Sequence, residues 1–133
     1  MIRQSKSQQG KSRERRGATV VEIAMILPLL FTLFWGFWEW SRVEMIRQAA
    51  ATAAYEGARR GILPGATIND METMANEKLI PYSVSDAVIT PSIDNVTNRA
   101  SVEITIPLKN NLWGSGRFLA DRNIVSKFEL RRE

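Results

Sequence analysis

A single carboxylate near the start of an apolar run is the group in this sequence best placed to do chemistry. Glu22 lies five residues after Gly17 and behind Arg15 and Arg16. A carboxylate costs up to about 2.5–3.5 kcal/mol at the centre of a bilayer, so we expect it to have a use. If the chain is cut between Gly17 and Ala18, the new α-amino group is a cation that Glu22 of a neighbouring chain can attract. The alternative is that Glu22 reaches the headgroups and pairs with Arg15 or Arg16.

The composition excludes most enzyme chemistry. The 133 residues include no cysteine and no histidine. Disulfides, thiolate zinc sites, Cys/His nucleophile pairs and imidazole acid–base catalysis are therefore excluded together. The acidic residues after Thr67 are scattered as on a solvated surface, so we expect no catalytic residue, no metal and no cofactor.

The elements that must position Glu22 begin with a membrane-spanning helix. From Val20 to Trp40, Glu22 is the only ionisable residue before Glu39, and the length matches a hydrocarbon core of roughly 30 Å at about 1.5 Å per residue. Tryptophan and phenylalanine crowd its C-terminal end, and Arg42 follows, as at a membrane interface. A buried helix of a soluble protein and a cleaved secretory signal are alternatives, but the rest of the chain is too short to wrap such a helix, and the small residues at 49–51 lie too far beyond the run.

The positive charge is local to the N-terminal tail. The net charge is +4, and six basic residues precede the apolar run: Arg3, Lys6, Lys11, Arg13, Arg15 and Arg16. From Ser41 onward acids and bases nearly balance, which argues against nucleic-acid binding. The excess of basic residues on the N-terminal side predicts a cytoplasmic N-terminus and an extracytoplasmic remainder.

Six ordered motifs carry a resemblance to a known family. They are Arg16-Gly17-Ala18, Val21-Glu22-Ile23, Leu27-Pro28, Gly36 to Glu39, Ala54 to Arg59, and Pro64-Gly65. Over residues Arg15 to Thr67 the chain resembles the TadE family of tight-adherence pilus pseudopilins. Ile23 departs from the family pattern, which usually has an aromatic residue after the glutamate.

The resemblance implies an α+β, pilin-like fold and a structural role rather than catalysis. It implies a minor pilin or pseudopilin of the bacterial inner membrane that takes part in pilus assembly, adhesion and biofilm formation. In that reading Gly17 precedes the cut, Ala18 is the new N-terminus, and Glu22 sets the subunit register. Arg13, Arg15 and Arg16 hold the leader in the cytoplasm. The implied partners are a prepilin peptidase, the inner-membrane assembly platform, other pilins and the lipid bilayer.

The expected organisation is a basic leader (1–17), a transmembrane helix (18–40) and an extracytoplasmic domain (41–133). One helix is predicted from Ala18 to about Arg60. Small residues recur every four positions along it, at Ala49, Ala53, Gly57 and Gly61. This ridge either contacts another subunit or packs on the chain's own sheet, and we favour the sheet.

A second helix and three strands are predicted beyond the long helix. Thr67 can cap a helix over Ile68 to Leu79, whose buried stripe is expected at Ile68, Met71, Met74, Ala75 and Leu79. Period-two patterns predict strands at Ser83–Thr90, Ala100–Pro107 and Asn123–Arg131, with a turn-rich connection between the first two. Trp113 and Phe118, in the loop before the last strand, either mark a partner surface or cover the sheet.

Two other functions compete with the pilus role. The chain could be an unprocessed single-pass envelope protein whose outer domain binds a ligand or scaffolds a complex. It could also be a regulator that binds anionic lipid through its basic tail. Processing separates the pilus role from both of these alternatives, because processing removes the first seventeen residues.

Overall fold

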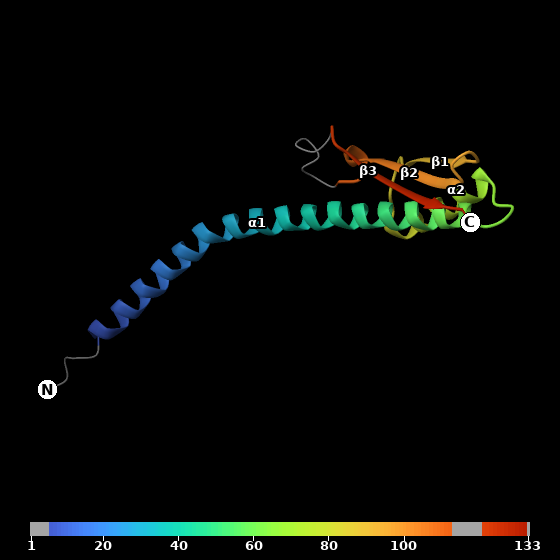
Figure 1. Ribbon diagram of the computed structural model, residues 1–133. Helices are drawn as coiled ribbons and strands as arrows, with labels where there is room; N and C mark the ends of the chain where they lie inside the picture. Colours follow the sequence, from blue (N-terminus) through green and yellow to red (C-terminus); the bar gives the residue numbers. More distant parts are fainter. Residues whose placement is uncertain (1–5, 113–120, 133) are drawn as a thin grey trace. The chain divides into compact units, whose positions relative to one another are not determined.

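The computed structural model describes the chain at residues 6–112 and 121–132, with side chains from residue 17 onward. Its elements, in order along the chain, are α1 (Lys6–Gly61), α2 (Ile68–Leu79), the short 3₁₀ helix η1 (Ile80–Tyr82), β1 (Val88–Asp94), β2 (Arg99–Pro107), the 3₁₀ helix η2 (Leu108–Asn110) and β3 (Asn123–Arg131) (Figure 1). The chain divides into two compact units, 1–38 and 39–133. A long N-terminal helix, a short helix and a three-stranded antiparallel sheet confirm the predicted α+β, pilin-like fold.

Helix α1 begins earlier than the sequence predicted. It starts at Lys6 rather than at Ala18 and runs for 56 residues to Gly61. The residues before Gly17 are mostly lysine, arginine, glutamine and glutamate, which are good helix formers. Gly17 therefore lies inside a continuous helix.

Helix α2 begins at a capping box. The backbone N–H of Asp70 donates to the Thr67 hydroxyl at 3.2 Å, and the N–H of Thr67 donates to the Asp70 carboxylate at 2.9 Å. The Thr67 N–H holds the pKa of Asp70 below its usual value, and the Thr67 hydroxyl adds to this. The predicted bounds of α2 match the structure, but the predicted stripe is wrong at Ile68, which is exposed at the first turn.

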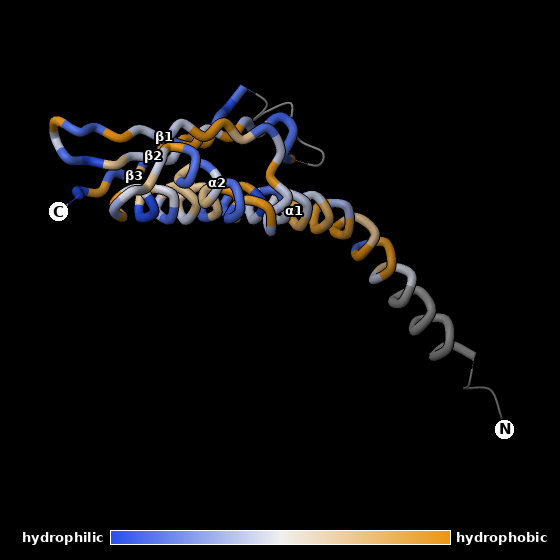
Figure 2. The backbone as a smooth tube through the Cα atoms, turned by 90° about the vertical axis from the view of Figure 1, so that its right-hand side faces the viewer, coloured by the Kyte–Doolittle hydropathy of each residue, from blue (hydrophilic) through white to orange (hydrophobic). Residues whose placement is uncertain are grey.

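The sheet has the order β1-β2-β3, with antiparallel pairs. The central strand β2 buries alternate side chains on one face: Ala100, Val102, Ile104 and Ile106. Figure 2 shows the corresponding alternation of hydrophobic and hydrophilic residues along the strands. The second and third strands lie where the sequence predicted them, with β2 starting one residue earlier, at Arg99.

The first strand was predicted too early in the chain. Ser83 and Asp86 adopt left-handed backbone conformations, with φ of 50° and 56°, so the chain turns there and cannot extend. Strand β1 instead covers Val88–Asp94 and takes in the first half of the segment predicted as a connection. It contains Pro91, which a sheet tolerates on an edge strand because no ladder hydrogen bond is needed on the open side.

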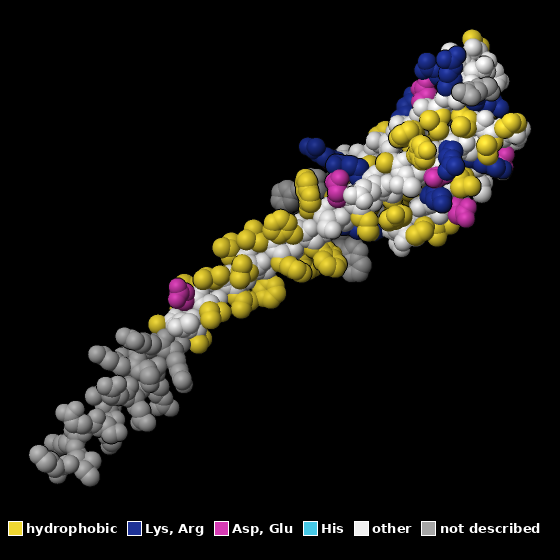
Figure 3. Space-filling view, turned by 60° about the horizontal axis from the view of Figure 1, so that its bottom comes forward, with side chains coloured by type: hydrophobic (Ala, Val, Ile, Leu, Met, Phe, Trp, Pro, Cys, Tyr) yellow, Lys and Arg dark blue, Asp and Glu magenta, His cyan; other side chains and the backbone are white. Residues whose placement is uncertain are grey.

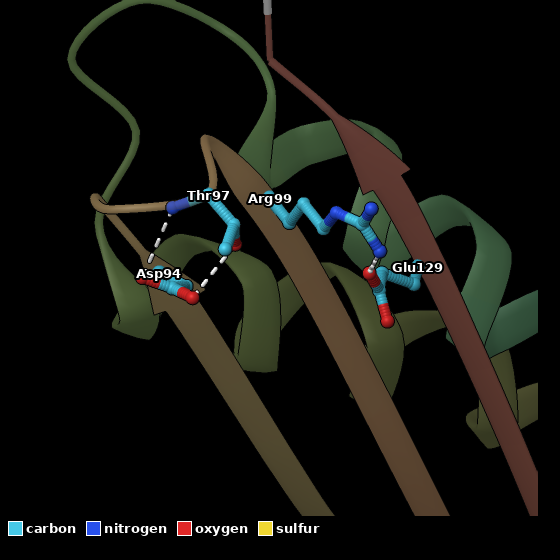
Figure 4. Close-up of polar contacts among 4 residues, drawn as sticks. All are labelled: Asp94, Thr97, Arg99 and Glu129. Atoms are coloured by element: carbon cyan, nitrogen blue, oxygen red, sulfur yellow. Dashed lines mark hydrogen bonds and ion pairs between the residues drawn. The ribbon is translucent and has the colours of Figure 1, made fainter.

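The β1–β2 turn is fixed by one carboxylate (Figure 4). Asp94 accepts the Thr97 hydroxyl at 2.7 Å and the Val96 N–H at 2.8 Å. These two hydrogen bonds hold the pKa of Asp94 below its usual value, and the bond from the Thr97 hydroxyl has the larger effect. Beside the turn, Arg99 forms an ion pair with Glu129 of β3, which raises the pKa of the Arg99 guanidinium.

The core of unit 39–133 lies between the second half of α1, helix α2 and one face of the sheet. Helix α1 contributes mainly alanines to it: Ile46, Ala49, Ala50, Ala53, Ala54 and Ala58. Small side chains let the helix backbone approach the strands closely, so large residues of the other elements fill the space, above all Met71, Ile104 and Ile106. Trp113 and Phe118 lie outside the described residues.

Candidate processing and membrane-assembly site

The N-terminal unit of α1 is apolar on every side. Side chains from residue 18 to residue 38 are all exposed, and most are large hydrophobic groups. Figure 3 shows them covering the visible face of this segment. Within the described parts of the chain, α1 is the one helix long and apolar enough to cross a membrane. Exposed apolar surface of this extent is stable in lipid and not in water, so the chain is a membrane protein with a single candidate span.

The residues predicted to form the processing site lie on the exposed surface of α1. Gly17, Ala18 and Glu22 are all exposed. A Cβ added at Gly17 would meet no described atom within 4 Å apart from its chain neighbours and its own helix backbone. Arg13, Arg15 and Arg16 belong to the same helix, but their side chains lie outside the described part of the chain.

Helical geometry places Ala18 and Glu22 on one face. Residues four positions apart differ by about 40° around a helix and by about 6 Å along it. The carboxylate of Glu22 is therefore within side-chain reach of an amino group created at Ala18 in the same chain. It is equally exposed to a neighbouring helix, because the structure packs nothing described against it.

Pro28 interrupts the hydrogen bonding of the span. Proline lacks an N–H, so the bond to the carbonyl four residues earlier is lost. The Thr32 hydroxyl donates to the Pro28 carbonyl at 2.9 Å, which keeps that side chain's own polar group paired within the helix. A hydroxyl paired in this way lowers the cost of placing threonine in hydrocarbon.

An aromatic belt ends the span. Its rings are exposed, at Trp35, Phe37, Trp38 and Trp40, and the Phe34 and Trp38 centroids lie 6.4 Å apart on one helix face. Amphipathic rings of this kind favour the headgroup layer. Glu39, in the middle of the belt, is only 6% exposed, which the sequence did not reveal.

The ridge of small residues faces the chain's own core. Ala49, Ala53, Gly57 and Gly61 are all buried. A Cβ at Gly57 would come within 3.1 Å of the Met71 carbonyl oxygen and of Val102 Cγ2. At Gly61 it would lie 2.6 Å from the Met71 sulfur. The ridge thus packs on α2 and β2, and its surface is not open to another subunit.

A polar cluster around Arg42 was not predicted from the sequence. The Arg42 guanidinium donates to the carbonyls of Tyr82 and Ser83, at 3.0 and 3.2 Å. Its Nε donates to the carbonyl of Asn111, whose side chain is itself buried. Nothing in the sequence pairs positions 42 and 111, which are 69 residues apart, so only the fold could reveal this cluster.

The described residues contain no group of three or more acidic, histidine or cysteine side chains able to hold a metal ion. Glu44 and Arg47 form an exposed ion pair at 3.1 Å, and Glu56 and Arg59 form an ion pair at 3.8 Å.

Part of the chain is similar to a known protein family. Residues 17–59 match the model of the TadE-like protein family. No curated protein and no solved structure matches the chain. The predicted resemblance is confirmed over this segment, which contains Gly17, Glu22, the span and most of the ridge. The similarity to the TadE-like family covers this segment, which is about a third of the chain.

Proposed function

We propose that the chain is a minor pilin or pseudopilin of a tight-adherence pilus, cut by a prepilin peptidase between Gly17 and Ala18. The observation that carries the proposal is the position of the TadE-like segment. It begins at Gly17, five residues before the only carboxylate in the first half of the span. A family whose members work with other pilus components and the membrane supplies the context.

The geometry of α1 supports cutting at this bond. A peptide bond inside a helix is shielded, so a peptidase that binds extended substrate must first unwind it. Glycine within a helix is less stable than alanine by roughly 0.5–1 kcal/mol, which makes Gly17 a favourable point for unwinding. The exposed surface around Gly17 also leaves room for an enzyme to approach.

After the cut, Glu22 has two uses that exclude each other in a given subunit. Its carboxylate can pair with the new amino group of Ala18 in its own chain, four residues away. It can instead pair with the amino group of a neighbouring subunit, which would fix the axial register of two helices. We propose the second use, because burial between helices strengthens an ion pair that would be screened at a surface.

The proposed location is the bacterial inner membrane, with the N-terminus cytoplasmic and the sheet outside. The basic residues before Gly17 support this orientation through the excess of positive charge on the cytoplasmic side. The proposed partners are the prepilin peptidase, the assembly platform and sibling pilins. Adhesion and biofilm formation would follow from the pilus that they build.

The unprocessed envelope protein stays the alternative, and Ile23 favours it because an aromatic residue is usual at that position in the family. The distinguishing experiment compares Gly17→Trp with Gly36→Trp. Both glycines lie in α1, and a Cβ at either meets no described atom outside its own helix surroundings. We expect Gly17→Trp to keep residues 1–17 and Gly36→Trp to lose them. Retention of residues 1–17 in the unmodified chain would contradict the proposal.

A further inference from the structure

Arg42 is the first basic residue after the aromatic belt of α1. A cation at this position ordinarily contacts lipid headgroups or contributes to membrane topology. Here the guanidinium is engaged elsewhere. It donates through Nη1 to Tyr82 O at 3.0 Å, through Nη2 to Ser83 O at 3.2 Å, and through Nε to Asn111 O at 3.4 Å.

The three carbonyls belong to two separate linkers. Tyr82 ends η1 and Ser83 follows it on the way to β1, whereas Asn111 follows η2 on the way to β3. The linkers are also tied to each other through the Asn111 side chain, which is 4% exposed. Its Oδ1 accepts the Ser85 N–H at 2.8 Å, and its Nδ2 donates to Ser85 O at 2.9 Å and to Pro107 O at 2.7 Å.

The first linker adopts a conformation that requires such support. Ser83 has a φ of 50°, which is unfavourable for a residue with a side chain. The linkers also cover one end of the core, because Leu108 is buried and Val84 and Leu112 pack against the core cluster. Release of the linkers would therefore expose apolar surface.

The geometry is specific to arginine. A guanidinium presents five N–H donors in a rigid planar fork, and three of its nitrogen atoms are used here. A lysine ammonium keeps the positive charge but places all of its donors at one point, so it cannot span carbonyls on two linkers. An arginine-to-lysine substitution can therefore separate the effect of the positive charge from the effect of the guanidinium geometry.

We propose that Arg42 is a strap that holds the two linkers of the 39–133 unit to α1 and closes one end of that unit's core, and that it is not a charge that binds lipid or sets membrane topology. Both linkers bind through it to one position of α1, so this end of the core stays covered. The strap does not depend on the cut at Gly17, because every residue in it lies beyond the span.

The test is amide hydrogen exchange on the full chain, in detergent micelles and in bilayers with and without anionic lipid. Arg42→Lys and Arg42→Ala are compared with the wild type. Arg47→Lys and Arg47→Ala are the matched controls, because Arg47 lies on the same helix in an exposed ion pair. The reporting amides are Ser85, Leu108 and Asn111, each with an assigned acceptor in or beside the linkers. The reference amide is Arg132, which bonds Asn98 O at the other end of the sheet.

We expect both Arg42 variants to raise exchange at the three linker amides at least about tenfold in every environment, with Arg132 unchanged. The Arg47 variants should leave all four amides unchanged. If the linker amides exchanged as slowly in Arg42→Lys as in the wild type, the proposal would be overturned, because the positive charge alone would then be enough to protect them. So would an effect confined to anionic bilayers, which would indicate headgroup binding. Equal loss of protection at Arg132 would show general unfolding and would also contradict a local strap.

Discussion

At the scale of single residues, the account depends on the chemistry of a carboxylate in a membrane. Glu22 is exposed on an otherwise apolar surface of α1, where an isolated charge is costly. A cut before Ala18 would create a compensating positive charge on the same helix face. In the proposed function, the residue type, the spacing and the apolar surroundings would together give Glu22 a use that a surface glutamate does not have.

Glu22→Gln should leave processing intact and weaken subunit association. Two opposite charges about 4 Å apart attract by about 4 kcal/mol at an effective dielectric constant of 20, and glutamine keeps the size without the charge. We therefore expect at least about tenfold less co-purification with sibling pilins from membranes. Glu22→Asp, which keeps the charge, is the control. Undiminished co-purification of Glu22→Gln would favour pairing within one chain instead.

A second residue-scale prediction concerns Asp94 and pH. Its pKa is lowered by the Thr97 hydroxyl and the Val96 N–H, so the folded state favours the carboxylate. The resulting stability is fully present above the unfolded pKa of about 3.9 and is lost as the pH falls through the lower folded pKa. Asp94→Asn should therefore be less stable than the wild type at pH 7, and the difference should shrink at pH 3.

Chemical unfolding at pH 7, 5 and 3 measures this difference. Asp121→Asn removes the same charge at another exposed position and serves as the control. A difference between Asp94→Asn and the wild type that is as large at pH 3 as at pH 7 would show that the turn does not depend on the ionised carboxylate.

At the scale of elements, the close approach of α1 to α2 and β2 depends on glycine. A Cβ at Gly61 would lie 2.6 Å from the Met71 sulfur and 2.9 Å from Ala100 Cβ. Met71 is flexible and can give way, but the Ala100 Cβ is fixed by the strand. We expect Gly61→Ala to destabilise the fold by about 1–3 kcal/mol, less the helix-propensity gain of up to about 1 kcal/mol.

Gly36→Ala is the matched control for Gly61→Ala. It makes the same change in the same helix, where the added Cβ meets no described atom outside its own helix surroundings. Chemical unfolding of the full chain in detergent measures both variants. Equal stability of the two would show that the ridge is not tightly packed against α2 and β2.

The helix cap can be tested in the same way. Thr67→Ala removes the hydroxyl that accepts the Asp70 N–H, and with it half of the capping box. Loss of an N-cap of this type costs about 1 kcal/mol. Thr73→Ala, which removes a hydroxyl from the middle of α2, is the control, and a larger loss in Thr73→Ala would contradict the role of the cap.

Some elements were predicted correctly from the sequence and others were not. Helix α2 was predicted with the correct bounds because its signals are local, with Thr67 as cap and Pro81 just beyond its end. Strand β1 was predicted at the wrong position because Ser83 and Asp86 adopt left-handed conformations. Serine and aspartate do not require such conformations, so the residue types did not predict the turns. Arg42 and Asn111 are joined only by the fold, so no periodicity could connect them.

At the scale of the whole molecule, a TadE-like segment and a small α+β domain are combined in one chain. The long apolar helix was predicted from the apolar run, because hydropathy is a property of the sequence itself. The fate of the first seventeen residues is a property of the chain in its membrane, and it decides between a pilus subunit and a resident envelope protein.

The most direct measurement is the N-terminal sequence and intact mass of the chain extracted from membranes, with and without the prepilin peptidase. The account predicts an N-terminus at Ala18 that appears only when the peptidase is present. It also predicts that Gly17→Trp abolishes this N-terminus and Gly36→Trp does not. A chain that retains residues 1–17 in both strains would contradict the pilus role and the register assigned to Glu22.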